Sequence, residues 1–237
     1  MLQASGLDGK SFLDIGSGSG LFSLAAMRLG ASRVHSFDFD RESVACAREL
    51  KARYFPESRH WTIEQGSALD EPYLSTLGTF DVVYAWGVLH HTGSMWQALE
   101  NACSRVAPGG KLFVAIYNDE GLRSRLWRAI KVRYCHSLAW RLPIVIGFGS
   151  YFSAKGLVKD LALLRNPLTR YRSYKTQRGM SYFTDLLDWL GGYPFETAKP
   201  DDVIDACCSR GFMLTRLKTP IQPKGNNEYV FLRVEPR

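Results

Sequence analysis

Three glycines at alternate positions follow an apolar run near the start of the chain: Gly16, Gly18 and Gly20. The apolar run, residues 12–15, reads as a strand, and a second apolar run, residues 34–37, ends in Asp38. Glycine adopts positive φ at little cost and lets a ligand lie against the backbone. The amides that begin the following helix attract a carboxylate or a phosphate. The order strand, glycine turn, helix, strand, acid is typical of a nucleoside-binding α/β unit.

The spacing of these residues distinguishes two kinds of nucleoside site. Asp38 lies 18 residues after Gly20, about the separation at which an acid ends the second strand and holds both ribose hydroxyls. A dinucleotide fingerprint would place its third glycine at position 21, which is Leu21. The pattern is instead D-x-G-x-G-x-G, beginning at Asp14.

The segment from Asp14 to Gly20 resembles motif I of the class I S-adenosylmethionine-dependent methyltransferases. The resemblance implies that S-adenosylmethionine is the cofactor, S-adenosylhomocysteine its product, and that no metal takes part. It implies contacts with the methionine half of the cofactor from five residues: Asp14, Gly16, Ser17, Gly18 and Gly20. It implies that Asp38 binds the ribose. The alternative is a structural Gly/Ser turn in another α/β protein.

Four further segments resemble the same family in the same order: Gln65–Leu69, Phe80–Val83, Trp86–His91 and Ala107–Lys111. The resemblance implies that Phe39 lies near the adenine and that Asp40 begins a helix. It implies that the adenine is lined by Gly66, Ser67 and Ala68. Ser67 replaces the usual acid or amide, which puts a hydrogen bond to the adenine amino group in doubt. Trp86 begins the loop in which, by this resemblance, cofactor and substrate meet.

Two adjacent histidines, His90 and His91, follow the fourth predicted strand, where the resemblance puts the transferred methyl group. Methyl transfer to a hydroxyl benefits from a general base, and histidine suits that role near neutral pH. We expect His91 rather than His90 to be the base. Asn118 or Asp119 could orient the histidine or bind a substrate hydroxyl. The alternatives are that the histidines complete a loop and that Asp119 caps a helix.

Four residues are predicted to contact the methyl acceptor: Tyr117, Trp189, Tyr193 and Glu228. Tyr117 ends the fifth strand, and Trp189 and Tyr193 belong to a predicted loop facing the same edge of the sheet. Glu228 opens the final strand, where a role in the hairpin turn is an equal alternative. Six other aromatic residues of the insertion line an apolar pocket or form a core: Trp127, Tyr134, Trp140, Phe148, Tyr151 and Phe152.

The elements that must position these residues alternate between strand and helix. This alternation predicts an α/β fold, a doubly wound, seven-stranded, mostly parallel sheet of the Rossmann-like methyltransferase kind. The last two strands, 212–218 and 228–234, are joined by a turn without a helix, so the last strand is expected to be antiparallel. We predict a cofactor-binding core at residues 1–117 and 196–237. Residues 118–195 are predicted to be a mainly helical, basic substrate lid inserted after strand five.

The inserted segment is expected to contain helices at 123–134 and 157–164 and to be interrupted at Pro143 and Pro167. Residues 118–180 contain 13 Lys and Arg against three acids, whereas the whole chain of 237 residues has a net charge of +7. Such a segment attracts an anionic substrate, a nucleic acid or a membrane surface, or it is a solvated helical face.

Five cysteines without a C-x-x-C pair, and no secretory signal, predict a cytoplasmic protein with reduced thiols. The sequence contains no run of about 18 apolar residues, so we do not expect a membrane span. Many family members carry a helix before the first strand, where this chain has only ten residues. Either the insertion alone covers the site, or the chain lacks a segment of the natural protein. The oligomeric state stays open.

These observations predict a methyltransferase that uses S-adenosylmethionine and acts on an oxygen of a small-molecule acceptor, with nitrogen as the second choice. The acceptor could be anionic or apolar. One alternative is a nucleic-acid methyltransferase that uses the basic insertion, although neither a Pro-Pro-aromatic nor a Pro-Cys motif follows the fourth strand. The other is a non-catalytic protein that binds the cofactor.

Overall fold

The computed structural model describes residues 6–178, 181–220 and 225–234. The chain divides into two compact units, one running to Asp119 and resuming at Glu196, the other spanning Glu120–Phe195. The sequence placed this division after Tyr117. Asn118 and Asp119 still belong to the first unit because Asn118 bridges to Ala198 and the amide of Asp119 donates to the Ala198 carbonyl at 3.0 Å.

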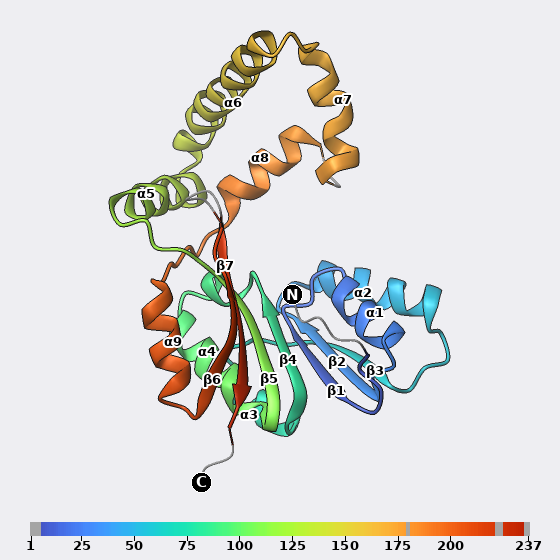
Figure 1. The fold of residues 1–237 in the computed structure, drawn as a ribbon. Helices are drawn as coiled ribbons and strands as arrows, with labels where there is room; N and C mark the ends of the chain where they lie inside the picture. The colour runs from blue at the N-terminus through green and yellow to red at the C-terminus, as the bar shows by residue number, and fades with distance from the viewer. Residues whose placement is uncertain (1–5, 179–180, 221–224, 235–237) are drawn as a thin grey trace. The chain divides into compact units, whose positions relative to one another are not determined.

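The first unit contains a seven-stranded sheet (Figure 1). Its strands are β1 (Ser11–Ile15), β2 (Arg33–Asp38), β3 (Trp61–Gln65), β4 (Phe80–Trp86), β5 (Val106–Tyr117), β6 (Phe212–Lys218) and β7 (Asn226–Arg233). They are ordered β3-β2-β1-β4-β5-β7-β6, and β7 is antiparallel to both of its neighbours. The predicted mostly parallel sheet with an antiparallel last strand is confirmed. The strand order reverses between β1 and β4, and ligands of open α/β sheets bind beyond the carboxyl ends of strands at such a point.

Helices cover both faces of the sheet, as Figure 1 shows. On one face lie α1 (Leu21–Arg28) and α2 (Arg41–Tyr54), whose Leu24 and Val44 share a core with Phe12 of β1. The other face carries α3 (Glu71–Thr76), α4 (Met95–Ser104) and α9 (Pro200–Cys208). Leu99 and Val203 share the second core with Leu13 of β1. Successive residues of β1, such as Phe12 and Leu13, therefore point to opposite faces of the sheet and pack into different cores.

Several predicted elements have different bounds in the structure. Proline and paired glycines commonly end a strand, but β5 begins at Val106 and includes Pro108, Gly109 and Gly110. The reason is that Val106 pairs with Phe80 before an irregularity shifts the register, so the Pro108-Gly109-Gly110 segment is accommodated without ending the strand. The short helices α3 and η1 (Leu89–His91) were not predicted. Asp40 caps α2 as expected, accepting from the amide of Ser43 at 2.8 Å.

Over its described residues, the second unit contains four helices: α5 (Leu122–His136), α6 (Leu138–Ala162), α7 (Pro167–Arg178) and α8 (Tyr182–Gly191). The prediction that Pro143 interrupts the segment is wrong, because Pro143 lies inside α6. A proline inside a helix removes one backbone hydrogen bond, yet α6 continues through Pro143 to Ala162. Pro167 does lie at a boundary between elements, since it is the first residue of α7.

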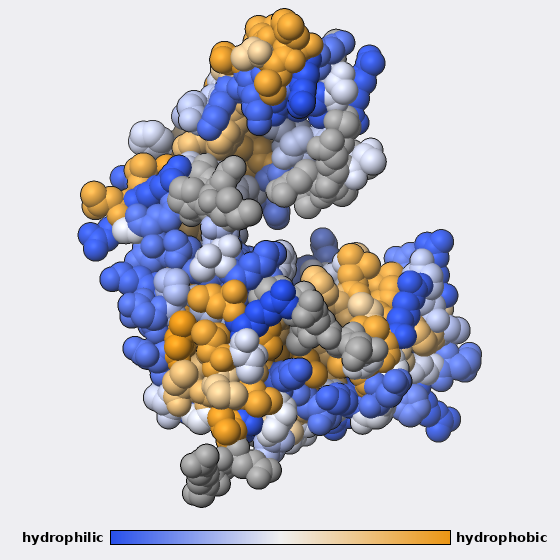
Figure 2. Space-filling view, viewed as in Figure 1, coloured by the Kyte–Doolittle hydropathy of each residue, from blue (hydrophilic) through white to orange (hydrophobic). Residues whose placement is uncertain are grey.

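The core of the second unit is made of aromatic rings from α5, α6 and α8. Trp127 meets Trp189 edge to face at 4.5 Å between ring centroids, and Phe148 and Phe152 contact Trp189 at 6.2 and 5.9 Å. Other apolar side chains stay exposed. Figure 2 shows hydrophobic residues gathered at the end of α6, where Leu161 and Leu164 are exposed. No helix in the described part of the chain combines the length and apolar character needed to cross a bilayer.

Candidate functional site

The glycine turn after β1 is held by backbone hydrogen bonds to the end of β2. The amides of Gly16 and Ser17 both donate to the carbonyl of Phe37, at 2.9 and 3.0 Å. Gly16, Gly18 and Gly20 have φ of +66°, +53° and +80°, a region that side chains other than glycine rarely adopt. The turn therefore has the backbone shape that its glycines predict.

The three glycines face different surroundings. A Cβ on Gly16 would lie 2.0 Å from Cγ2 of Val88, and a Cβ on Gly20 would lie 3.0 Å from the Cβ of Ala47. A Cβ on Gly18 would meet no described heavy atom within 4 Å. Gly16 and Gly20 thus permit close packing of protein against protein, whereas Gly18 borders open space that a ligand can occupy.

Asp38 lies at the end of β2, and its carboxylate contacts this turn. One oxygen accepts from the amide of Gly18 at 2.8 Å and the other from the amide of Asp40 at 2.9 Å. An ionised carboxylate can accept about four hydrogen bonds. Because these two amides use only two of them and the residue is partly exposed, Asp38 keeps acceptor capacity for a diol.

Ser17 offers the turn a second polar group. Its residue is 7% exposed, and its buried Oγ has no hydrogen-bond partner among the described residues. Burying an unpaired hydroxyl costs free energy, so such a group is expected to have a ligand or water partner. The unpaired Ser17 hydroxyl and the open space at Gly18 fit a polar amino-acid tail such as that of S-adenosylmethionine.

Asp14 is buried beneath the turn, where its carboxyl accepts from Oγ of Ser23 at 2.5 Å. Ser23 Oγ lies 2.6 Å from Ser36 Oγ, which accepts from the indole of Trp61 at 2.7 Å. Burial raises the pKa of Asp14 from 3.8 to about 7, although the bonds from Ser23 oppose that shift. The carboxyl predicted to contact the cofactor is thus the end of a buried hydrogen-bond chain. Ser23 and Ser36 were not predicted, because no local pattern marks them.

The residues predicted to line the adenine follow β2 and β3, and Trp86, predicted to begin the loop where cofactor and substrate meet, ends β4. Phe39 is 77% exposed and Trp86 is 44% exposed, so both present aromatic surface. The amide of Gly66 donates to the Asp38 carbonyl at 3.0 Å. Ser67 Oγ accepts from the amide of Leu69 at 3.1 Å, which shows that this hydroxyl already supports its own loop. Ala68 is the buried member of the group, at 8% exposure.

The two histidines belong to η1, two residues after β4, and contact Tyr117 at the end of β5. His90 is fully buried and His91 is partly exposed. The ring centroids of His90 and Tyr117 are 4.0 Å apart, and those of His91 and Tyr117 are 5.5 Å apart, edge to face. Val88 begins the same loop and sits against Gly16. The histidine loop and the glycine turn therefore pack against each other.

Glu196 fixes this histidine loop from a distant part of the sequence. Its amide donates to the carbonyl of His90 at 3.0 Å, and its carboxylate accepts from the amide of Met95 at 3.1 Å. Met95 is the first residue of α4, whose N-cap Ser94 provides no side-chain bond. Glu196 thus caps α4 and holds η1 together. Sequence spacing gives no signal for a contact that joins residues so far apart.

Asn118, Asp119 and Glu228 lie at the same carboxyl edge. Asn118 Oδ1 accepts from Asn227 Nδ2 at 2.9 Å. The N-cap position of α5 is Gly121 and not Asp119, because α5 starts at Leu122. Glu228 pairs with Lys218 on the neighbouring strand at 3.4 Å. Within the described ranges, no group of three or more His, Cys, Asp or Glu is arranged to hold a metal ion.

Trp189 and Tyr193 belong to the second unit. Trp189 was expected in a loop but lies within α8, where it packs against the aromatic core described above. The ring of Tyr193 meets that of His136 edge to face at 5.4 Å. Both residues thus have structural contacts in their own unit, and their role toward an acceptor stays a prediction.

Comparisons with known proteins agree with this geometry. A family model described as "Methyltransferase domain" matches residues 13–112. The "Ubiquinone biosynthesis O-methyltransferase" of Pseudomonas aeruginosa is 30% identical over 192 residues, which cover 76% of this chain and 79% of the relative. The solved magnesium protoporphyrin IX methyltransferase of Synechocystis, with bound SAH, has a TM-score of 0.56 at 15% identity, covering 96% of this chain and 75% of that one.

A second solved structure with the same fold is the N-methyltransferase NodS of Bradyrhizobium japonicum. It has a TM-score of 0.53 at 14% identity and covers 96% of this chain and 88% of that one. At such identities the likeness concerns the fold and not the acceptor atom.

The contrast between glycines gives a first prediction. Gly18→Ala is expected to weaken binding of S-adenosylhomocysteine, because the new methyl group enters the open space at the turn. Gly78→Ala is the matched control, since Gly78 also has positive φ, +72°, and no described atom near its missing Cβ. Both variants should lose stability by roughly 1 kcal/mol from backbone strain. Calorimetric titration should show weaker binding for Gly18→Ala alone, and equal affinities would contradict the assignment of the turn.

The buried carboxyl of Asp14 gives a second prediction. Its pKa is raised to about 7, so the folded state binds the proton more tightly than the unfolded chain. The stability contributed by this proton is complete below the unfolded pKa and is lost as pH rises through about 7. Asp14→Asn cannot ionise, so its stability relative to the original protein should rise between about pH 5 and pH 7.5, by up to a few kcal/mol.

Urea unfolding of both proteins at the two pH values measures this difference. Asp81→Asn is the control, because hydrogen bonds from Ser11 lower the pKa of Asp81, which is then ionised in both states over this range. The effect of that substitution should not change with pH. If the Asp14→Asn difference is equally independent of pH, the carboxyl is not held in its neutral form.

Proposed function

The chain belongs to the class I S-adenosylmethionine-dependent methyltransferases, and we propose that it methylates an oxygen atom of a small-molecule acceptor. The observation that carries this proposal is the packing of the histidine loop against the glycine turn, through Val88 and Gly16. The histidine loop, with the proposed base, and the glycine turn, which is proposed to bind the cofactor, then lie at the same edge of the sheet. The relatives named O-methyltransferases support oxygen over nitrogen.

In the proposed complex, the glycine turn holds the amino-acid part of the cofactor and Asp38 holds its nucleoside part. Ser17 and the open backbone at Gly18 receive the amino-acid tail, and the remaining lone pairs of Asp38 accept the ribose hydroxyls. The exposed rings of Phe39 and Trp86 supply apolar surface for the adenine side. When bound, the cofactor supplies a methyl group on a positively charged sulfur.

The proposed base is His91. The buried ring of His90 packs against both His91 and Tyr117, with centroids 4.5 and 4.0 Å away, and so serves to position its neighbour. His91 is the partly exposed member of the pair and is the one that an acceptor hydroxyl can reach. A ring nitrogen of His91 takes the hydroxyl proton as the oxygen attacks, which keeps the negative charge on oxygen from developing fully.

The remaining predicted residues are proposed to contact the acceptor. Tyr117 touches both histidine rings, and Asn118 and Asp119 continue from it along the same edge. Glu228 faces Ala115 on β5, the strand that Tyr117 ends. The Glu120–Phe195 unit is proposed to be the substrate lid, because it is inserted directly after this strand. Positioning and exclusion of water by such a lid are large contributors to methyl transfer.

The cofactor assignment is tested at the second strand. Asp38→Ala should weaken binding of S-adenosylhomocysteine by about 10- to 100-fold, because a charged acceptor of the ribose hydroxyls is lost. Asp40→Ala is the matched control: it removes the neighbouring carboxyl and the cap of α2 but no ribose contact. Calorimetry should show unchanged affinity for the control. Equal losses in both variants would reject the role of Asp38.

The base is tested by steady-state kinetics with catechol and a set of phenols as acceptors. His91→Gln should lower kcat by about 10²- to 10⁴-fold and leave S-adenosylhomocysteine binding unchanged, since general-base catalysis contributes that much. His90→Gln should lower kcat less, because that ring acts through its neighbour. Unchanged turnover in both variants would remove the histidines from the mechanism, and turnover of amines alone would move the acceptor atom to nitrogen.

A further inference from the structure

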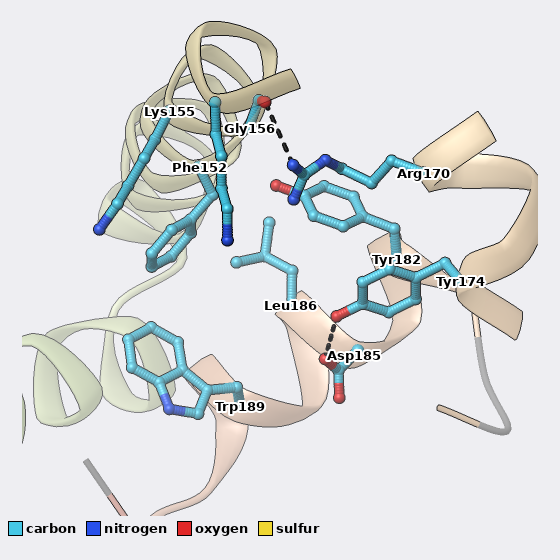
Figure 3. Close-up of a pocket in the computed structure, with 10 residues that line it drawn as sticks. Phe152, Lys155, Gly156, Arg170, Tyr174, Tyr182, Asp185, Leu186 and Trp189 are labelled. Carbon is cyan, nitrogen blue, oxygen red and sulfur yellow. Dashed lines mark hydrogen bonds between the residues drawn. The ribbon is translucent and has the colours of Figure 1, made fainter. Parts of the chain in front are cut away.

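The Glu120–Phe195 unit contains a cavity of about 400 Å³, whose lining shares Trp189 with the predicted acceptor contacts. Helices α6, α7 and α8 supply all of its lining residues, which Figure 3 draws. The residues that matter for its chemistry are Phe152, Lys155, Lys159, Arg170, Tyr182 and Trp189. A cavity of this size is in the range that binds a small organic molecule.

One part of the cavity is apolar. Leu186 is 7% exposed, and the rings of Phe152 and Trp189 meet edge to face at 5.9 Å between centroids. Figure 3 shows these three side chains together on one side of the hollow. Aromatic walls of this kind favour a flat or alkyl body, which buries apolar surface against them.

The cavity also has cationic side chains in its lining. Lys155 and Lys159 lie one turn apart on α6, and neither has an ion-pair partner among the described residues. Arg170 from α7 lies across from them and forms a two-point pair with Asp160, at 2.7 and 2.6 Å. Those bonds hold the pKa of Asp160 below its ordinary value, and the charges of Arg165 and Lys159 act in the same direction. Asp160 is therefore shared among several cations, and Lys155, Lys159 and Arg170 outnumber Asp160 and Asp185 at the cavity.

The remaining acid at the cavity already has a partner. Asp185 accepts from the hydroxyl of Tyr174 at 2.5 Å, on the side of the hollow away from Lys155. The hydroxyl of Tyr182 is buried and has no hydrogen-bond partner among the described residues. Figure 3 shows it directed toward the guanidinium of Arg170. A donor without a partner therefore lies beside the cationic wall, where an anion would accept from it.

A second hollow, of about 510 Å³, continues the polar side. It shares Lys159, Arg170 and Tyr174 with the first and adds Arg165. The cationic side chains thus stand between an apolar hollow and a polar one. This arrangement matches a ligand with two chemically different ends.

We propose that the α6–α8 cavity binds a small amphiphilic anion, with its aryl or alkyl body on the Phe152–Trp189 wall and its phosphate or carboxylate between Lys155, Lys159 and Arg170. The head group would complete the charge balance of the two lysines and accept from the Tyr182 hydroxyl. This site is separate in its residues from the glycine turn and the histidines, and its existence does not depend on which acceptor is methylated.

The test is calorimetric titration of the full chain, without cofactor, by four probes: naphthyl phosphate, naphthoate, naphthylmethylammonium and inorganic phosphate. Naphthyl phosphate and naphthoate should bind at one saturable site, more weakly as salt is raised. Naphthylmethylammonium and inorganic phosphate should bind about tenfold or more weakly, because each lacks one of the two matching ends. Because no methyl transfer is involved, the outcome is independent of the proposed catalytic function.

A second experiment compares naphthyl phosphate binding by variants that lose two positive charges, either on α6 at the cavity or on α5 away from it. Lys155→Gln with Lys159→Gln should weaken naphthyl phosphate binding by about tenfold or more. Arg125→Gln with Arg128→Gln removes the same charge from exposed positions of α5 and should leave affinity unchanged. Thermal unfolding and circular dichroism check that both double variants fold.

The proposal would be overturned if the folded chain showed no saturable binding of either naphthyl anion, or if it bound the naphthyl cation as tightly as the anions. Equal losses of naphthyl phosphate affinity in the two double variants would also overturn it. Equal binding of inorganic phosphate would also overturn it, since the apolar wall would then contribute nothing.

Discussion

The close approach of Gly16 to Val88 is the constraint on which the carboxyl edge of the sheet depends. A Cβ at Gly16 would come within 2.0 Å of the valine side chain, so the turn after β1 and the loop after β4 can meet only because glycine stands there. The carbonyl of Phe37 fixes the turn by accepting from two of its amides, and Asp38 accepts from a third. One small residue thus brings the ends of three strands together at the point where the strand order reverses.

The sheet and its strand directions were predictable from short apolar runs that are separated by glycines and helical patterns. Strands and helices that alternate in this way can be arranged in only a few folds. Phe80–Trp86 and its neighbours have that local signal. The errors occur where tertiary pairing overrides a local rule. Gly109 and Gly110 are absorbed into β5 because Val106 already pairs with Phe80, and Pro143 remains in α6. The short α3, which Asp70 caps through the amide of Tyr73, gives too brief a pattern to detect.

The candidate site was predictable where residue type and spacing in the sequence indicate the role. It was less predictable where the role depends on how deeply a side chain is buried. Asp38 and the glycines follow from a local motif. The difference between a buried His90 and a partly exposed His91 does not, because it comes from packing against Tyr117 and from the amide of distant Glu196. The environment of Asp14 likewise depends on serines that belong to α1 and β2. Its raised pKa is a property of the assembled core.

The positive charge of residues 118–180 separates, in the structure, into three physically different groups. Arg125 and Arg128 are exposed on α5, where water solvates them at little cost. Lys131 is buried, and desolvation lowers its pKa to about 8 while its ammonium donates to the carbonyl of Trp189. Lys155 and Lys159 are exposed as well, but they border the α6–α8 cavity, where cations outnumber acids. A count of charges along the sequence cannot separate these groups, because the difference between a solvated face, a structural cation and a ligand site lies in what each ammonium faces. Only the third group gives the surplus charge a specific recognition role.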